Sequence, residues 1–238
     1  MIQGRILTIH ESKWSPSGFK DAVTDSKTAL GGFTLKYTII ASLVSLGLLA
    51  AGAQAQEGNR NDATVSAIGS FEQSTNGNGV NQSANNSAGV LFTYRHFFTN
   101  HQGLELDYGF NRFDQQYNSL NPVTPFSLAV PANTNEATAS YVFRYGIGHR
   151  LTPFLSAGTG ALVFVPNSFT NGGTSGRTFA TPDFVYSAGA DFAVSRRVSL
   201  RLGYRGHIFE APDFGVPGIR TGSVTQMAEP FGGLSFHF

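Results

Sequence analysis

One run of the sequence alternates apolar and polar side chains over a full membrane-crossing length. Residues 103–113 place four large apolar side chains on one face (Leu104, Leu106, Tyr108 and Phe110), and Glu105 and Asp107 lie between them. A period of two residues indicates a β-strand with two different faces. A tilted strand needs about 9–11 residues to cross a bilayer, so this segment is long enough to span one.

The same alternation recurs along the chain and predicts eight strands. The predicted strands are residues 63–72, 88–98, 103–113, 136–145, 152–164, 184–194, 198–208 and 226–238. Residues 63–72 show the pattern more weakly than the others. Residues 152–164 are rich in glycine, and the pattern does not show which of their side chains share a face.

Composition favours membrane-crossing strands over either a soluble globule or a bundle of helices. Only 13% of residues are charged, against roughly 25% in soluble domains. The mean hydropathy of −0.08 is too low for a bundle of membrane helices. The absence of cysteine excludes disulfides, thiolate metal sites and a cysteine nucleophile.

The connections between predicted strands alternate between short and long. Short turns are centred on Asn100, Gly148 and Arg196, whereas the other connections are long and polar, as in Thr75–Ser87 and Asn167–Gly176. Outer-membrane barrels have short periplasmic turns and longer extracellular loops. We therefore predict an all-β fold, an eight-stranded antiparallel up-and-down transmembrane β-barrel, in which the first and last strands pair to close the ring.

The polar face of the strands carries charges of both signs, and we expect it to line the lumen. Three-residue turns would place Arg95 opposite Glu105 and Asp191 opposite Arg201, which are favourable cross-strand pairs. A soluble barrel with an apolar lumen is the alternative, but an arginine facing lipid near the midplane would cost about 2–4 kcal/mol. The predicted lumenal ion-pair network comprises Arg95, Glu105, Asp107, Arg144, Asp191, Arg201 and Arg205.

The first 55 residues have the pattern of an export signal. Lys36 precedes an apolar run at residues 37–50, and Ala53 and Ala55 form a small-residue cleavage site. A short apolar segment between a positive charge and such a site is typical of a secretory signal peptide. We expect a signal peptide at 36–55 and a barrel at 56–238. Residues 1–35 form an N-terminal extension, which a start codon assigned too early would explain.

The C-terminal strand carries the most specific signal in the chain. Residues 233–238 read Gly-Leu-Ser-Phe-His-Phe and alternate aromatic residues back from the last position. Together with the eight strands, this end resembles the small outer-membrane barrels of the OmpA-transmembrane-domain and OmpX type. The resemblance implies that Gly233, Leu234, Phe236 and Phe238 form the signal that the barrel-assembly machinery recognises. It also implies a monomer in the bacterial outer membrane, contacting lipid and lipopolysaccharide after delivery by export chaperones.

The sequence offers little chemistry beyond the barrel. It has no H-x-x-x-H or H-E-x-x-H spacing, so we assign no metal site, no cofactor and no catalytic residue. His207 and Asp191 could form a relay, but a structural network is the simpler interpretation. From Gln56 onward the chain has 11 Arg and 12 Asp plus Glu, which gives no basic face for nucleic acid. We expect a non-enzymatic envelope protein that acts through its loops. A narrow solute pore and a lipid A-modifying enzyme are the alternatives.

Overall fold

The computed structural model of the chain describes residues 60–146, 150–167, 170–171 and 174–238. The expected N-terminal extension, the signal peptide and the cleavage residues Ala53 and Ala55 lie outside these residues. None of the helices among the described residues is long and apolar enough to cross a membrane.

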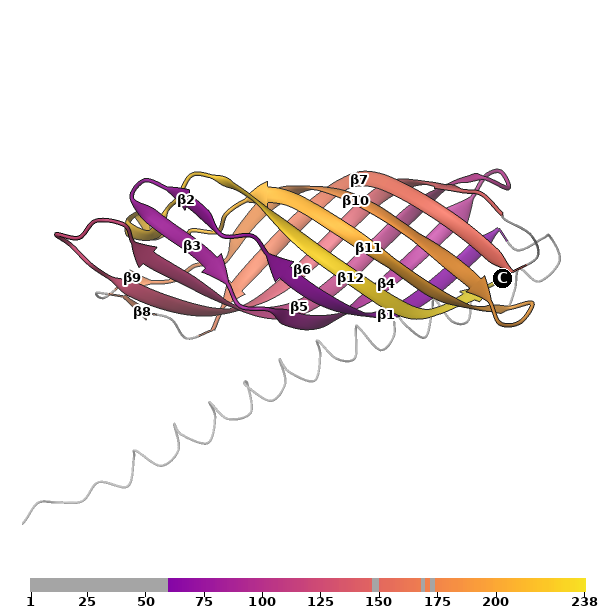
Figure 1. The fold of residues 1–238 in the computed structure, drawn as a ribbon, viewed down its shortest axis with the longest axis horizontal. Coiled ribbons are helices and arrows are strands. Elements are labelled where there is room, and N and C mark those ends of the chain that lie inside the picture. The colour runs from indigo at the N-terminus through magenta and orange to yellow at the C-terminus, as the bar shows by residue number, and fades with distance from the viewer. Residues whose placement is uncertain (1–59, 147–149, 168–169, 172–173) are drawn as a thin grey trace, which may run out of the picture. The chain divides into compact units, whose positions relative to one another are not determined.

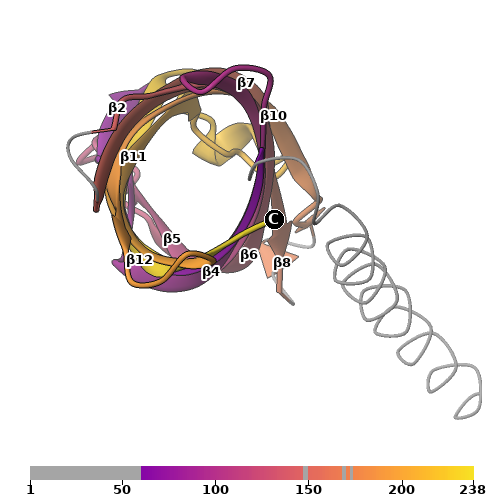
Figure 2. The same cartoon turned by 90° about the vertical axis from the view of Figure 1, so that its right-hand side faces the viewer.

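Eight long antiparallel strands close into a barrel (Figures 1 and 2). They are β1 (Asn61–Glu72), β4 (Ser87–Phe97), β5 (Gln102–Ser119), β6 (Ser127–Arg144), β7 (Leu151–Pro166), β10 (Phe179–Ala193), β11 (Val198–Glu210) and β12 (Val224–His237). Each strand pairs with its neighbours in the chain, and β1 pairs with β12 to close the ring. The predicted number of strands, their order and the closing pair are confirmed.

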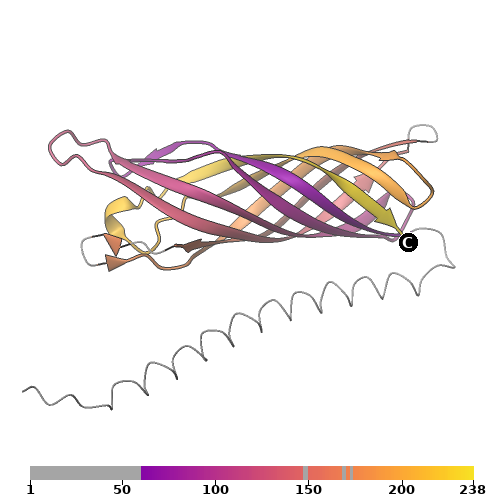
Figure 3. The same ribbon diagram turned by 90° about the horizontal axis from the view of Figure 1, so that it is seen from below.

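Three of the four long connections contain further regular structure. The first forms the hairpin of β2 (Thr75–Gly77) and β3 (Val80–Ala84), and β3 pairs with β5. The connection between β7 and β10 contains β8 (Thr170–Asn171) and β9 (Thr174–Ser175), and a 3-10 helix, η2 (Pro217–Ile219), lies between β11 and β12. All long connections gather at one end of the barrel and the short turns at the other (Figure 3).

Strands β5 and β6 are longer than predicted, because both continue into segments that the sequence analysis assigned to a loop. Each has 18 residues, whereas a bilayer crossing needs about 9–11. Residues 114–119 are polar, but they pair with β3 on one side and with β6 on the other. The pairing continues the barrel wall beyond the membrane.

The outward face forms an apolar band whose edge is visible along β5. Leu104, Leu106, Tyr108 and Phe110 are 41–54% exposed, and the next outward residue is the exposed Arg112. Such a continuous apolar band suits contact with lipid tails. The band therefore ends between Phe110 and Arg112, and the rest of β5 projects past it.

The structure also settles the facing of the glycine-rich strand β7. Phe154, Ser156, Leu162 and Phe164 are buried and point into the barrel, on the same side as Gly158 and Gly160. A side chain at Gly158 would meet the backbone of β6. Glycine at these positions therefore allows the close approach of two neighbouring strands.

Candidate functional site

The barrel interior near the short turns holds a cluster of two arginines and three carboxylates. Arg95 on β4 pairs with Glu105 directly opposite on β5, and its Nη1 lies 3.7 Å from Asp191. Arg201 on β11 donates to both oxygens of Asp191, at 2.6 and 3.0 Å, and to Asp62 on β1 at 3.1 Å. All five side chains are at most 8% exposed, so this turn-end cluster is buried inside the barrel.

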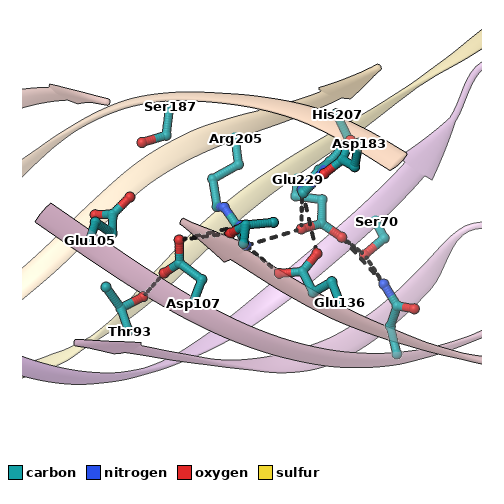
Figure 4. Close-up of polar contacts among 12 residues, drawn as sticks. Ser70, Thr93, Glu105, Asp107, Glu136, Asp183, Ser187, Arg205, His207 and Glu229 are labelled. Carbon is teal, nitrogen blue, oxygen red and sulfur yellow. Dashed lines mark hydrogen bonds and ion pairs between the residues drawn. The ribbon is translucent and has the colours of Figure 1, made fainter. Parts of the chain in front are cut away.

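A second cluster, the central cluster, lies further along the lumen and joins opposite walls (Figure 4). Arg205 donates to Glu136 Oε1 at 2.6 Å and lies 3.7 Å from both Asp107 and Glu229. Asp107 also accepts hydrogen bonds from Thr93 at 2.6 Å and Thr138 at 3.2 Å.

Glycine makes room for one member of the central cluster. A side chain at Gly109 on β5 would overlap the carboxyl group of Glu136, its cross-strand partner on β6. The pairing of a small residue with a large one lets the glutamate reach Arg205 across the lumen. Eight strands enclose only enough space for side chains, so such compensation is needed to fit the charged groups.

Beyond the central cluster the lumen becomes apolar, which the sequence analysis did not predict. On one wall Gln82 and Gln115 hydrogen-bond to Glu72 and to each other. Twelve buried hydrophobic side chains pack together into one apolar plug. They are Val80, Phe113, Tyr117, Val130, Ala132, Leu162, Phe164, Phe209, Phe214, Val216, Ile219 and Met227.

The connection between β11 and β12 supplies part of this plug by folding into the mouth of the barrel. Figure 2 shows its helix η2 within the ring of strands. Phe214 is fully buried and Ile219 is 1% exposed. The Tyr117 hydroxyl donates to the carbonyl oxygen of Pro212 at 2.7 Å, which ties the loop to β5. Phe214 has a φ of 50° and is followed by Gly215 at 72°, so a left-handed turn directs the ring inward.

Arg144 departs from the predicted network. Its guanidinium lies 3.5 Å from the centre of the Phe97 ring, and its Nε donates to the Asn100 carbonyl at 3.1 Å. No carboxylate of the described residues forms an ion pair with it. Its position at the last residue of β6 explains the difference, because the side chain reaches the turn rather than the lumenal clusters. There it lines a cavity of about 640 Å³ with Arg150, Asp191 and His237, among other residues.

The other predicted network residues are brought together, but the prediction missed four carboxylates. Arg95, Glu105, Asp107, Asp191, Arg201 and Arg205 all lie in the two clusters, and the predicted registers Arg95–Glu105 and Asp191–Arg201 are confirmed. The missed residues are Asp62, Glu136, Asp183 and Glu229. Glu136 and Glu229 could have been predicted to face the lumen. They lie on correctly predicted strands, at even or odd positions that match those of the lumenal Thr138 and Ser235.

The relay considered between His207 and Asp191 is wrong, because His207 contacts other carboxylates. His207 Nδ1 lies 2.7 Å from Asp183 Oδ2, and its Nε2 lies 3.3 Å from Glu229 and 3.5 Å from Glu136. Asp191 belongs to the turn-end cluster instead. The His207 side chain is 0% exposed. It therefore has no access to a lipid head group at the membrane surface.

The C-terminal residues lie at the seam of the barrel. Leu234 and Phe236 face outward and are 48% and 49% exposed, while Gly233 faces β1, where a side chain would meet Ser66. The backbone of Phe238 exchanges two hydrogen bonds with Asn61, at 2.9 and 3.1 Å. The pairing between first and last strands thus extends to the final residue.

Comparison with known proteins agrees with this architecture. The family model described as an outer membrane protein beta-barrel domain matches residues 41–225, more than half of the chain. Neisserial surface protein A has 14% sequence identity and a TM-score of 0.53, over 77% of this chain and 100% of its own. OprG from Pseudomonas aeruginosa has 11% identity and a TM-score of 0.52, over 77% and 98%. At these identities the likeness concerns the fold alone. Among curated proteins, none matches this chain in sequence.

Proposed function

The chain belongs to the outer membrane protein β-barrel family and is integral to the bacterial outer membrane, and we propose that it is a closed, non-enzymatic anchor that acts at the cell surface. Its barrel holds the long connections at one side of the membrane, and these connections perform the function by contacting other molecules. The apolar plug is the observation that carries the proposal.

The plug supports an anchor over a solute pore. Phe113, Tyr117, Phe164 and Phe214 are fully buried in it, and eight strands leave little space beyond their own side chains. A hydrophilic solute would have to displace these rings and the charged clusters beneath them. Breaking a buried ion pair alone costs about 3–5 kcal/mol.

The tip of the β5–β6 hairpin supports a role in surface contacts. Leu120, Val123 and Phe126 lie in its connection and are 55%, 84% and 38% exposed. They stand beyond the apolar band, at the end of a strand pair that continues past the membrane. Exposed apolar groups that lie clear of lipid are typical of sites where another molecule binds.

The tip is tested by replacing Leu120, Val123 and Phe126 with serine. We expect the triple variant to reach the outer membrane at the normal level, because these side chains support no strand pairing. Cells that express it should adhere less to polystyrene, used as an apolar probe surface, than cells with the unaltered protein. Equal adhesion at equal surface levels would count against a role for the tip.

Two further measurements test the alternative functions. The purified protein in a planar bilayer should show no steady single-channel steps, and regular steps would overturn the closed anchor in favour of a pore. Mass spectrometry of lipid A from cells with and without the gene should give the same profile. A difference in acylation would indicate a lipid-modifying enzyme.

A further inference from the structure

Three ligand-type side chains from three strands converge inside the central cluster. His207 comes from β11, Glu136 from β6 and Glu229 from β12, and one ligand atom from each lies within 4.8 Å of the others. Their side chains are 0%, 3% and 0% exposed. Figure 4 shows the three groups directed toward one another across the lumen. We propose that they bind one divalent metal ion, zinc by preference.

One polar atom of each residue makes no hydrogen bond and faces the other two. His207 Nε2, Glu136 Oε2 and Glu229 Oε2 are buried. The imidazole nitrogen lies 3.3 Å from the Glu229 oxygen and 3.5 Å from the Glu136 oxygen, and Arg205 lies 3.7 Å from Glu229. A buried polar atom that makes no hydrogen bond costs about 1–3 kcal/mol. Because these three atoms face one another, one cation placed between them would satisfy all three.

The remaining polar atoms of the three residues are held in place by neighbours. Arg205 binds Glu136 Oε1, and Ser70 donates to Glu229 Oε1 at 2.7 Å. Asp183 Oδ2 lies 2.7 Å from His207 Nδ1. An ionised carboxylate can only accept, so Asp183 keeps the proton on Nδ1. With the proton on Nδ1, Nε2 is the ring atom that can bind a cation, as in metal-binding histidines supported by a carboxylate.

The charge balance around the site favours a cation. Asp107, Glu136, Asp183 and Glu229 contribute four carboxyl groups, and Arg205 is the one guanidinium that the described residues place among them. Even when His207 is counted with Arg205 as a basic group, the carboxyl groups exceed the basic groups by two (four minus two). The turn-end cluster has an excess of only one, with three carboxylates against two arginines. The uncompensated charge therefore lies where the three ligand atoms meet.

The two distances from the imidazole nitrogen fit zinc. Ligands about 2.0–2.1 Å from a tetrahedral zinc ion lie about 3.3–3.4 Å from one another. His207 Nε2 is 3.3 Å from Glu229 Oε2 and 3.5 Å from Glu136 Oε2. One imidazole with two carboxylates is a zinc-type ligand set, whereas calcium and magnesium select oxygen alone. Three protein ligands leave the fourth position to a water molecule.

The position of the site indicates a structural role. Strand β6 lies opposite β12 in the ring, so the ion would connect two walls that share no backbone hydrogen bonds. The ligands are closed off by the plug on one side and the turn-end cluster on the other. We therefore expect the ion to enter while the barrel closes and to remain bound afterward.

The test measures zinc in the protein expressed from its full gene and purified from membranes with a histidine-free tag and no chelator. Elemental analysis should find about one zinc per chain, in the protein as isolated or after refolding with zinc sulfate. Refolding with zinc should raise the urea midpoint above that obtained with EDTA. Cobalt in place of zinc should give the visible absorption bands of a tetrahedral ion.

Two variants separate the metal site from a network held by a protonated histidine. His207→Gln should reduce bound zinc to background and abolish the difference between zinc and EDTA. Asp107→Asn is the matched control, because Asp107 is buried in the same cluster and faces Arg205 but offers no ligand atom. It should keep the zinc. The proposal is overturned if the unaltered protein binds no zinc under either condition, or if His207→Gln binds as much. The measurement on the unaltered protein decides even where a variant fails to fold.

Discussion

Arg201 is the residue whose removal tests the interior network most directly. It is 1% exposed and makes three charge-assisted hydrogen bonds, two to Asp191 and one to Asp62. The bond to Asp191 follows the β10–β11 hairpin, whereas the bond to Asp62 passes over β12 to reach β1. One guanidinium therefore connects both sides of the closing seam.

Arg201→Met keeps an unbranched apolar stem and removes the guanidinium with its charge and its three hydrogen bonds. It leaves Asp62 and Asp191 buried, and among the described residues Asp191 then keeps one ion pair, with Arg95 at 3.7 Å. Removing one partner of a buried ion pair costs about 3–5 kcal/mol. With a urea dependence of about 2 kcal/mol per molar, a loss of 4 kcal/mol lowers the unfolding midpoint by about 2 M.

The assay is urea unfolding in lipid vesicles, followed by circular dichroism and by gel mobility without boiling. The exposed Arg197 lies four residues away in the turn, and Arg197→Met is the control, with an expected change within about 0.5 kcal/mol. Adding Asp62→Asn and Asp191→Asn to Arg201→Met should recover most of the loss, because no uncompensated charge remains. A loss below about 1 kcal/mol for Arg201→Met, or no recovery in the triple variant, would refute the reasoning.

Three further predictions concern the wall of the barrel. Leu106→Arg should lower the free energy of unfolding in vesicles by about 2–4 kcal/mol, because it places a charge in the apolar band that contacts lipid. Gln116→Arg lies on the same face of β5 beyond that band and should lower it by about 0–1 kcal/mol. Equal losses for the two variants would contradict a band that ends between Phe110 and Arg112. Gly109→Ala should cost about 1–3 kcal/mol in the same titration because its new methyl group overlaps a buried carboxyl, whereas Gly218→Ala, with open space around it, should be neutral. Phe238→Ala should reduce the amount of protein in the outer membrane of cells while leaving refolding of the purified chain unchanged; impaired refolding would assign this residue to stability rather than to the assembly signal.

Much of the wall could be predicted from the sequence because its determinants are local. Alternation along each strand separates the two faces, and the length of a turn sets the register of the hairpin that it joins. The opposition of Arg95 to Glu105 and of Asp191 to Arg201 follows from these two facts. The same logic extends to Glu136 and Glu229, whose parity places them inside the barrel.

What lies across the lumen could not be predicted in this way. Contacts such as Arg205 with Glu136 or His207 with Glu229 depend on the tilt and stagger of the closed ring, which are properties of all eight strands together. The apolar plug is equally non-local, since it brings Phe113 of β5 against Phe214 of a distant connection.

The sequence by itself therefore determined a membrane barrel, its eight strands and, outside the glycine-rich residues 152–164, the face that side chains on the alternating strands take. Only the tertiary structure decided that the outer end is sealed by an apolar plug, that Arg144 leaves the network, and that three ligand-type atoms meet in the middle. The physical reason is that the face on which a side chain lies depends on whether its position along one strand is odd or even. Its partner across the lumen depends instead on how the whole sheet closes.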